Sequence, residues 1–111
     1  MTKLLSGRVA LVTGGGRGLG RSFAEHLASL GCHVGVHGMR EHGPSEDGEG
    51  TTLTDTAKQI AETHDVRTTR VLGDLTIAAD VERVVQTVTA ELGPIDILVH
   101  NAGGDIAAAG G

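Results

Sequence analysis

The residues best suited to chemistry in this chain form a glycine-rich segment, Thr13 to Gly20, with the sequence T-G-G-G-R-G-L-G. An apolar run at residues 9–12 precedes it and predicts a buried strand, and apolar residues at helical spacing follow it. A strand, a tight turn and a helix start together present backbone N–H groups and a positive helix end to a phosphate. Glycine suits such a turn because the ligand approaches the backbone closely. The segment therefore predicts a phosphate-binding turn.

The spacing of the glycines distinguishes between types of phosphate-binding turn. The G-x-G-x-x-G dinucleotide pattern does not fit from Gly14, because Leu19 occupies the position of its third glycine. Residues 15–22 differ from the P-loop pattern at one position, where Arg21 replaces the lysine that reaches the β- and γ-phosphates. The pattern that fits is T-G-x-x-x-G-x-G over residues 13–20. Taken alone, a glycine-rich segment can also be a purely structural turn.

Length and composition limit what the chain can be. A chain of 111 residues forms at most one domain of modest size. Its net charge of −5 and its single aromatic residue argue against nucleic-acid binding, which relies on basic surfaces or stacking rings. The lone Cys32 suits a reducing compartment, and no apolar run reaches the length of a signal peptide or a membrane span. We expect a soluble cytoplasmic α/β domain with neither nucleic-acid nor membrane partners.

Strands and helices are expected to alternate along the chain. Apolar runs predict strands at residues 8–12, 32–37, 67–72 and 95–100. Helical periodicity predicts helices at residues 18–30, from residue 53 onward, and from residue 77 to residue 92. The expected apolar faces of the first and third helices are Leu19, Phe23, Leu27 and Leu30, and Ile77, Val81, Val84, Val85, Val88 and Leu92. Residues 41–50 combine glycines with four acids, so we expect a flexible acidic loop there.

This alternation predicts the topology of a Rossmann doubly wound parallel sheet. Right-handed crossovers, with the strand order of a first dinucleotide-binding half, give the order 3-2-1-4. The first two helices then cover one face of the sheet and the third helix covers the other. The strand at residues 95–100 becomes an edge, although its continuous apolar sequence suits an interior strand. We therefore expect residues 1–111 to form the N-terminal part of a longer dinucleotide-binding domain.

Three motifs resemble those of the short-chain dehydrogenase/reductase family. They are the T-G-x-x-x-G-x-G segment, the pair Asp74-Leu75, and the run His100-Asn101-Ala102-Gly103 with its lead-in at residues 93–99. Each motif falls at the carboxyl end of an expected strand, where open α/β sheets bind ligands. The resemblance covers the whole chain apart from the loop at residues 41–50.

The resemblance implies roles for the glycine-rich turn. The backbone around Gly14, Gly16, Gly18 and Leu19 would line the pyrophosphate of a nicotinamide dinucleotide. Gly20 would permit close packing of the helix against the strand.

The other two motifs would contact the remaining parts of the cofactor. By resemblance, Asp74 would accept a hydrogen bond from the adenine amino group, and Leu75 would lie against the ring. Asn101 would brace the fourth strand through backbone contacts, while Ala102 and Gly103 would border the cofactor ribose. Taken alone, Asp74 and Asn101 are also ordinary turn residues at strand ends.

The end of the second strand bears on the choice between NADP and NAD. NAD enzymes usually place an acid there to bind the ribose 2′-hydroxyl, but no carboxylate precedes Glu41. Arg40, and Arg17 within the glycine turn, could form charge-assisted bonds with a 2′-phosphate. We therefore predict NADP, with NAD as the alternative, in which both arginines are solvated surface residues.

The chain contains no residue to which catalysis can be assigned. Family chemistry is hydride transfer between the nicotinamide and an alcohol or ketone substrate, with a tyrosine, a lysine and a serine. This chain has no tyrosine, and its six histidines show no metal-ligand spacing, so we predict no metal site. Family resemblance implies a homo-oligomer, either a dimer or a tetramer.

Three functions remain open from the sequence. The first is the cofactor-binding part of an NADP-dependent oxidoreductase, which we adopt. The second is a non-catalytic dinucleotide-binding module or sensor. The third is a nucleotide phosphatase or kinase that uses the altered P-loop and would require magnesium-dependent ATP binding.

Overall fold

The computed structural model describes residues 3–16, 18–42 and 52–101. Its elements are β1 (Val9–Thr13), α1 (Gly18–Ser29), β2 (His33–Gly38), α3 (Leu53–His64), β3 (Thr68–Leu72), α4 (Ala78–Leu92) and β4 (Ile97–His100). Every expected strand and helix is therefore present in these ranges, with its ends shifted by a few residues at most. None of the described helices has the length and apolar character that crossing a bilayer requires.

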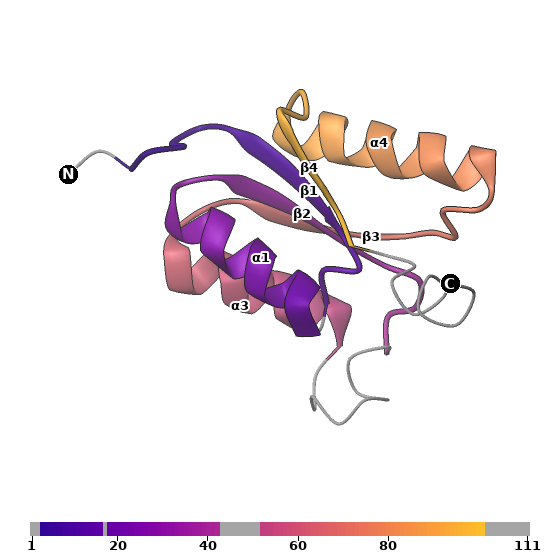
Figure 1. The fold of residues 1–111 in the computed structure, drawn as a ribbon, viewed down its shortest axis with the longest axis horizontal. Helices are drawn as coiled ribbons and strands as arrows, with labels where there is room; N and C mark the ends of the chain where they lie inside the picture. Colours follow the sequence, from indigo (N-terminus) through magenta and orange to yellow (C-terminus); the bar gives the residue numbers. More distant parts are fainter. Residues whose placement is uncertain (1–2, 17, 43–51, 102–111) are drawn as a thin grey trace.

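The strands form one parallel sheet in the order β3-β2-β1-β4. Helices α1 and α3 lie on one face of this sheet and α4 lies on the other (Figure 1). Both the strand order and the placement of the helices confirm the sequence-based prediction of a Rossmann-type sheet. The parallel arrangement brings the carboxyl ends of all four strands to one edge of the molecule.

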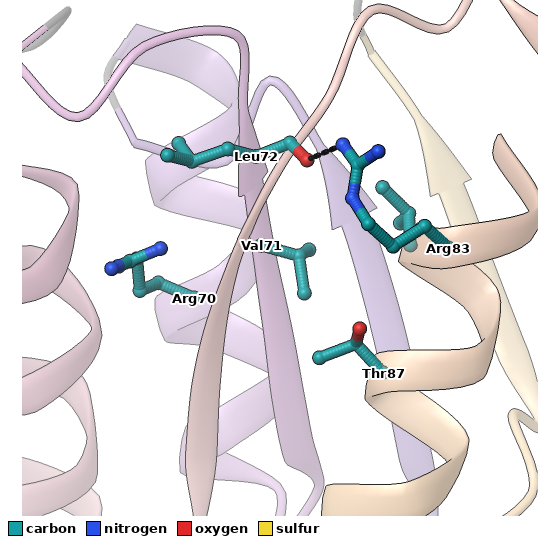
Figure 2. Close-up of a pocket in the computed structure, with 6 residues that line it drawn as sticks. Arg70, Val71, Leu72, Arg83 and Thr87 are labelled. Carbon is teal, nitrogen blue, oxygen red and sulfur yellow. Dashed lines mark hydrogen bonds between the residues drawn. The ribbon is translucent and has the colours of Figure 1, made fainter. Parts of the chain in front are cut away.

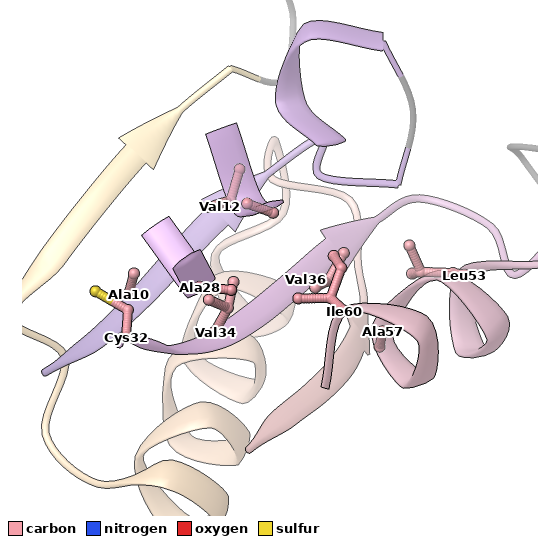
Figure 3. Packing of buried hydrophobic residues seen from close by; sticks show 10 residues of the cluster. Ala10, Val12, Ala28, Cys32, Val34, Val36, Leu53, Ala57 and Ile60 are labelled. Atoms are coloured by element: carbon pink, nitrogen blue, oxygen red, sulfur yellow. The ribbon is translucent and has the colours of Figure 1, made fainter. Parts of the chain in front are cut away.

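Small residues bring α1 close to the sheet. Its buried positions are Gly20, Ala24 and Ala28, which lie four residues apart on one face. The cluster below them contains alternate residues of β1 and β2 together with the apolar face of α3 (Figure 3). The expected apolar face therefore does not meet the sheet at its N-terminal end, since Leu19 is 64% exposed and Phe23 is also exposed. Bulky side chains at the sheet-facing positions would hold the helix too far from the strands.

The opposite face of the sheet packs against α4 through a second apolar cluster. Val84, Val88 and Leu92 are buried there, and a Cβ at Gly35 would lie 2.8 Å from a methyl carbon of Val88. Only part of the expected apolar face is buried, because Ile77, Val81 and Val85 are exposed. Arg83 and Thr87 flank α4 on the β3 side, so Val81 and Val85 turn toward the β4 side.

Strand β4 is an edge of the described sheet, as expected. Asp96 ties its start to β1, since its carboxylate accepts the Val9 N–H at 3.0 Å and its own N–H donates to the Val9 carbonyl at 2.8 Å. On the α4 side of the sheet, Leu98 pairs with Leu11 but is 60% exposed. The β4 side of α4 and the neighbouring strand edge thus present apolar side chains and unpaired backbone groups together.

We predict that the 111-residue polypeptide by itself self-associates, because β4 has no neighbour on one side among the described residues and carries the exposed Leu98. Sedimentation at micromolar concentration should show mostly oligomers or aggregates. Leu98→Lys should increase the monomer fraction, whereas Leu4→Lys, at an equally apolar but distant exposed position, should not. A stable, dilute monomer with cooperative unfolding would contradict this prediction.

Candidate functional site

The expected motifs gather at the carboxyl edge of the sheet. The glycine turn follows β1, the Gly73-Asp74 turn follows β3, and Asn101 follows β4. Because the order is β3-β2-β1-β4, the turn after β1 lies between those other two segments, with the end of β2 beside it. Arg17, Ala102 and Gly103, which were also expected at the site, lie outside the described residues.

The glycine turn has a backbone that requires glycine at two positions. Gly14 has φ +62° and Gly18 has φ +55°, both in the left-handed region that other residues rarely adopt. The N–H of Gly14 donates to Nδ1 of His37 at 3.1 Å, and the N–H of Gly15 donates to the His37 carbonyl at 2.8 Å. Gly14 can therefore line a ligand with its backbone surface but not with its N–H. Helix α1 begins after this turn, at Gly18, and continues with Leu19, so the positive end of the helix dipole lies at the same edge.

The end of β4 is tied to the glycine turn. The Asn101 N–H donates to Oγ1 of Thr13 at 2.8 Å, and its side-chain amide approaches the Gly14 carbonyl at 3.5 Å. A Cβ at Gly20 would overlap that same carbonyl and lie 2.8 Å from the Asn101 amide nitrogen. The first turn of α1 and the end of β4 thus both contact the Gly14 carbonyl, directly after β1. This is the geometry that close packing at Gly20 and a bracing role for Asn101 require.

Asp74 is held in a defined orientation by its own turn. Its Oδ1 accepts the N–H of Thr76 at 2.9 Å and the Thr76 hydroxyl at 2.7 Å. These bonds from Thr76 lower the pKa of the Asp74 carboxyl, so the group is ionised at neutral pH. Its Oδ2 makes no hydrogen bond to any described residue. Asp74 can therefore serve the turn with one oxygen and accept a ligand N–H with the other, while Leu75 beside it is half-buried.

Further bonds fix the start of the same turn. The carboxylate of Asp80 accepts the Asp74 N–H at 2.8 Å and pairs with Arg83 at 3.0 Å. Arg83 also donates to the Leu72 carbonyl at 2.8 Å (Figure 2). The hydrogen bond from the Asp74 N–H and the one from Arg83 lower the pKa of Asp80. The pocket in Figure 2 lies between β3 and α4 and contains none of the expected site residues.

The end of β2 carries exposed and paired charges. Arg40 is exposed two residues after the strand. Glu41 is used elsewhere, because its carboxylate accepts the Thr54 N–H at 2.7 Å and pairs with Arg70 at 3.0 Å. Desolvation opposes ionisation of Glu41, but bonds from Thr54 and Thr52 and the charge of Arg70 outweigh it and lower its pKa. The first acid of the expected flexible loop is thus anchored at the start of α3, and residues 43–50 lie outside the described residues.

Sequence analysis missed His37, which is 1% exposed at the end of β2. Its Nδ1 accepts the Gly14 N–H, and its Nε2 lies 2.9 Å from the Gly73 carbonyl. No local motif marks this residue, because β2 also begins with a histidine, His33, and ends one residue later at Gly38. In the part of the chain that the structure describes, no three His, Cys, Asp or Glu side chains gather as metal ligands.

Comparisons with known proteins give relatives along the whole chain. A family model described as short chain dehydrogenase matches residues 8–110. The cyclohexanol dehydrogenase of Rhodococcus sp. is 34% identical over 108 residues, which cover 92% of this chain and 38% of that protein. The 3-oxoacyl-(acyl-carrier-protein) reductase FabG of Escherichia coli is 35% identical over 97 residues, which cover 87% of this chain and 34% of that protein. The chain therefore spans between a third and two fifths of the length of these relatives.

One solved structure is similar to this chain both in fold and in sequence. L-sorbose reductase from Gluconobacter frateurii, complexed with NADPH and L-sorbose, matches with a TM-score of 0.77 and 32% identity. The match covers 93% of this chain and 36% of that chain. The family model and the structural match each extend over nearly all of this chain. The chain belongs to the short-chain dehydrogenase family, a family of oxidoreductases.

Proposed function

We propose that residues 1–111 are the N-terminal, cofactor-binding part of a longer NADP-dependent oxidoreductase. The complete protein would transfer a hydride between the nicotinamide and an alcohol or ketone substrate. The observation that carries this proposal is the convergence of the glycine turn, Asp74 and Asn101 at one edge of the sheet. A cyclohexanol dehydrogenase and a sorbose reductase complexed with NADPH among the relatives support it. We also expect a cytoplasmic homo-oligomer, a dimer or tetramer.

Each segment at this edge would bind one part of the dinucleotide. The helix start at Gly18 and Leu19, with the backbone surfaces of Gly14 and Gly16, would line the pyrophosphate. Gly20 would hold the helix start close to the strand. The partial positive charge of the α1 N-terminus favours an anion at that position.

The two neighbouring segments would bind the adenosine and ribose parts. Asp74 would accept the adenine amino group through Oδ2, and Leu75 would cover the ring. Asn101, Ala102 and Gly103 would border the ribose next to the nicotinamide. The bound nicotinamide supplies or accepts the hydride. The residues that hold the substrate and move the proton would lie in the remainder of the protein, because this chain has no tyrosine.

The charges at the end of β2 favour NADP over NAD. Glu41 is bonded to the start of α3 and to Arg70, so its carboxylate does not serve a ribose 2′-hydroxyl in this arrangement. Arg40 and Arg17 would supply guanidinium donors to a 2′-phosphate. NAD remains the alternative, in which an acid between residues 43 and 50 would bind the ribose.

Two alternative functions, an ATP-binding P-loop and a dinucleotide sensor, would also use the glycine turn. An ATP-binding P-loop needs a cation at position 21 that points toward the phosphates, but Arg21 donates to the Gln59 side chain on α3 at 2.9 Å. A non-catalytic dinucleotide sensor would use the same site without turnover. The intact mass of the natural protein, with assays of NADPH oxidation by simple ketones, distinguishes the sensor from the enzyme.

We predict that Gly14→Val in the complete protein weakens dinucleotide binding at least about tenfold, or about 1.4 kcal/mol. A Cβ at Gly14 would stand where the phosphate and backbone must meet, at a left-handed φ that valine disfavours. Calorimetric titration with NADP⁺ measures the loss. Gly7→Val is the matched control, since Gly7 also has a positive φ but lies at the opposite end of β1 in open space.

Two results would contradict this site. One is unchanged affinity in a folded Gly14→Val protein. The other is thermal protection by magnesium ATP in the absence of protection by NADPH, which would favour the P-loop function.

We predict that Arg40→Ala weakens NADP(H) binding by about 1–3 kcal/mol and leaves NAD(H) binding nearly unchanged. A phosphate gains more than a hydroxyl from a charged, forked donor. The difference should shrink at high salt because Arg40 is exposed. Arg21→Ala, which removes a guanidinium bonded to α3, should change neither affinity. Tighter binding of NAD(H) than NADP(H) by the unmodified protein would overturn the assignment.

A further inference from the structure

His37 forms hydrogen bonds with two turns at the candidate site. The register places it next to Thr13 across β1, on the same side of the sheet as α4. Its ring lies between the Gly14 N–H, in the turn after β1, and the Gly73 carbonyl, in the turn after β3. The first turn would contact the pyrophosphate and the second leads directly into Asp74. One buried imidazole thus spans the distance between them.

The two backbone partners dictate the protonation of this ring. Gly14 offers only an N–H at 3.1 Å, so Nδ1 must accept and carry no proton. Gly73 offers only a carbonyl oxygen at 2.9 Å, so Nε2 must carry the proton and donate it. Both nitrogens are satisfied only in the neutral Nε2–H tautomer. A proton on Nδ1 would point a second donor at the Gly14 N–H inside a buried site.

Displacing Gly14 would affect more than one contact. The Gly14 carbonyl is where Gly20 of α1 and the amide of Asn101 meet. A shift of this peptide therefore moves the helix start relative to the ends of β1 and β4. The position of the phosphate-binding backbone depends on the acceptor that His37 supplies.

We infer that His37 is a positioning residue that holds the glycine turn in its dinucleotide-binding conformation, and that protonation of its ring releases Gly14 and weakens dinucleotide binding. This inference rests on the proposed function of the turn. It adds a residue from outside the three motifs, and it predicts that binding weakens as the pH falls through the folded pKa of His37.

The surrounding groups support a neutral ring near pH 7. Burial lowers the pKa of His37 from its ordinary value of 6.5, against the opposing bond to Gly73, and the charge of His100 lowers it further. His100, at the end of β4, lies 3.2 Å from the Thr13 hydroxyl through its own Nδ1. The carboxylates of the turn after β3 have partners of their own, since Asp74 accepts from Thr76 through Oδ1 and Asp80 accepts from the Asp74 N–H and Arg83.

The sign of the effect follows from this lowered pKa. Because the pKa of His37 is lowered below 6.5 in the folded protein, its ring is neutral well above that pH, and pH has no effect on binding through this group there. As the pH falls through the folded pKa of His37, each binding event must first remove a proton. Affinity should then decrease by up to about tenfold for each pH unit.

The experiment measures NAD⁺ affinity of the complete protein by calorimetry from pH 7.5 down to the lowest pH at which the protein remains folded. NAD⁺ is the probe because it lacks the 2′-phosphate, whose second pKa near 6 would titrate in the same range. His37→Asn keeps an acceptor that can reach the Gly14 N–H but does not titrate. It should bind at pH 7.5 within several-fold of the unmodified protein and show no loss in acid.

Two histidine variants serve as matched controls. His33 lies at the other end of β2 and also accepts a backbone N–H through Nδ1, from Arg67 at 2.9 Å. His33→Asn should therefore retain the acid-induced loss of affinity, and so should His100→Asn. An equally steep loss in His37→Asn, or a loss abolished by His100→Asn instead, would overturn the inference.

A ligand-free measurement separates this inference from the proposed function. In the complete protein with ¹⁵N-labelled histidine and glycine, the His37 ring should show the Nε2–H tautomer at pH 7.5. The Gly14 amide shift should follow the titration of that ring. A ring protonated on Nδ1 at pH 7.5 would overturn the positioning role. If NAD⁺ and NADP⁺ bind at no pH, the proposed function fails, while coupled His37 and Gly14 titrations would still support the positioning role.

Discussion

At Gly20 the first turn of α1 lies so close to the Gly14 carbonyl that a side chain has no room, and this contact constrains the layer above the sheet. Because α1 starts there, its next sheet-facing positions must also be small, and they are Ala24 and Ala28. The close approach brings the positive end of the helix to the carboxyl edge of the strands, where an anion can reach it. The same requirement turns Leu19 toward solvent at the edge where the dinucleotide would bind.

The topology could be predicted from sequence because few alternatives satisfy its rules. Alternating strands and helices, right-handed crossovers and parallel pairing leave little choice of strand order. The buried helix faces were predicted less well because apolar periodicity gives the direction of a stripe without saying which part of it meets the sheet. In α4 that stripe is wide, and Val84 and Val88 are buried while Val81 and Val85 are exposed. Helix orientation is set by tertiary contacts, such as the one between Val88 and Gly35, that sequence spacing does not contain.

Among the candidate site residues, those in local motifs were accessible to sequence analysis, whereas His37 was not. Its partners Gly14 and Gly73 lie 23 and 36 residues away in sequence, so no local pattern marks it. The same holds for Glu41, whose place in an acidic loop suggested a solvated residue. In the structure its carboxylate accepts the Thr54 N–H in the first turn of α3 and pairs with Arg70 on β3. Long-range hydrogen bonds of this kind follow from the fold and become visible only once the strands are placed.

The polar groups beneath the turns explain how a site made largely of loops can be ordered before a ligand arrives. Thr13 receives the Asn101 N–H, His37 receives the Gly14 N–H, and Asp80 receives the Asp74 N–H. Each of the three turns thus has a backbone donor fixed by a side chain from a strand or helix, which are more rigid than loops. A ligand that binds such turns loses little free energy in ordering them. These three backbone donors are therefore unavailable to a ligand. A dinucleotide would have to be recognised by the helix start and by other groups of the turns, such as the Asp74 carboxylate.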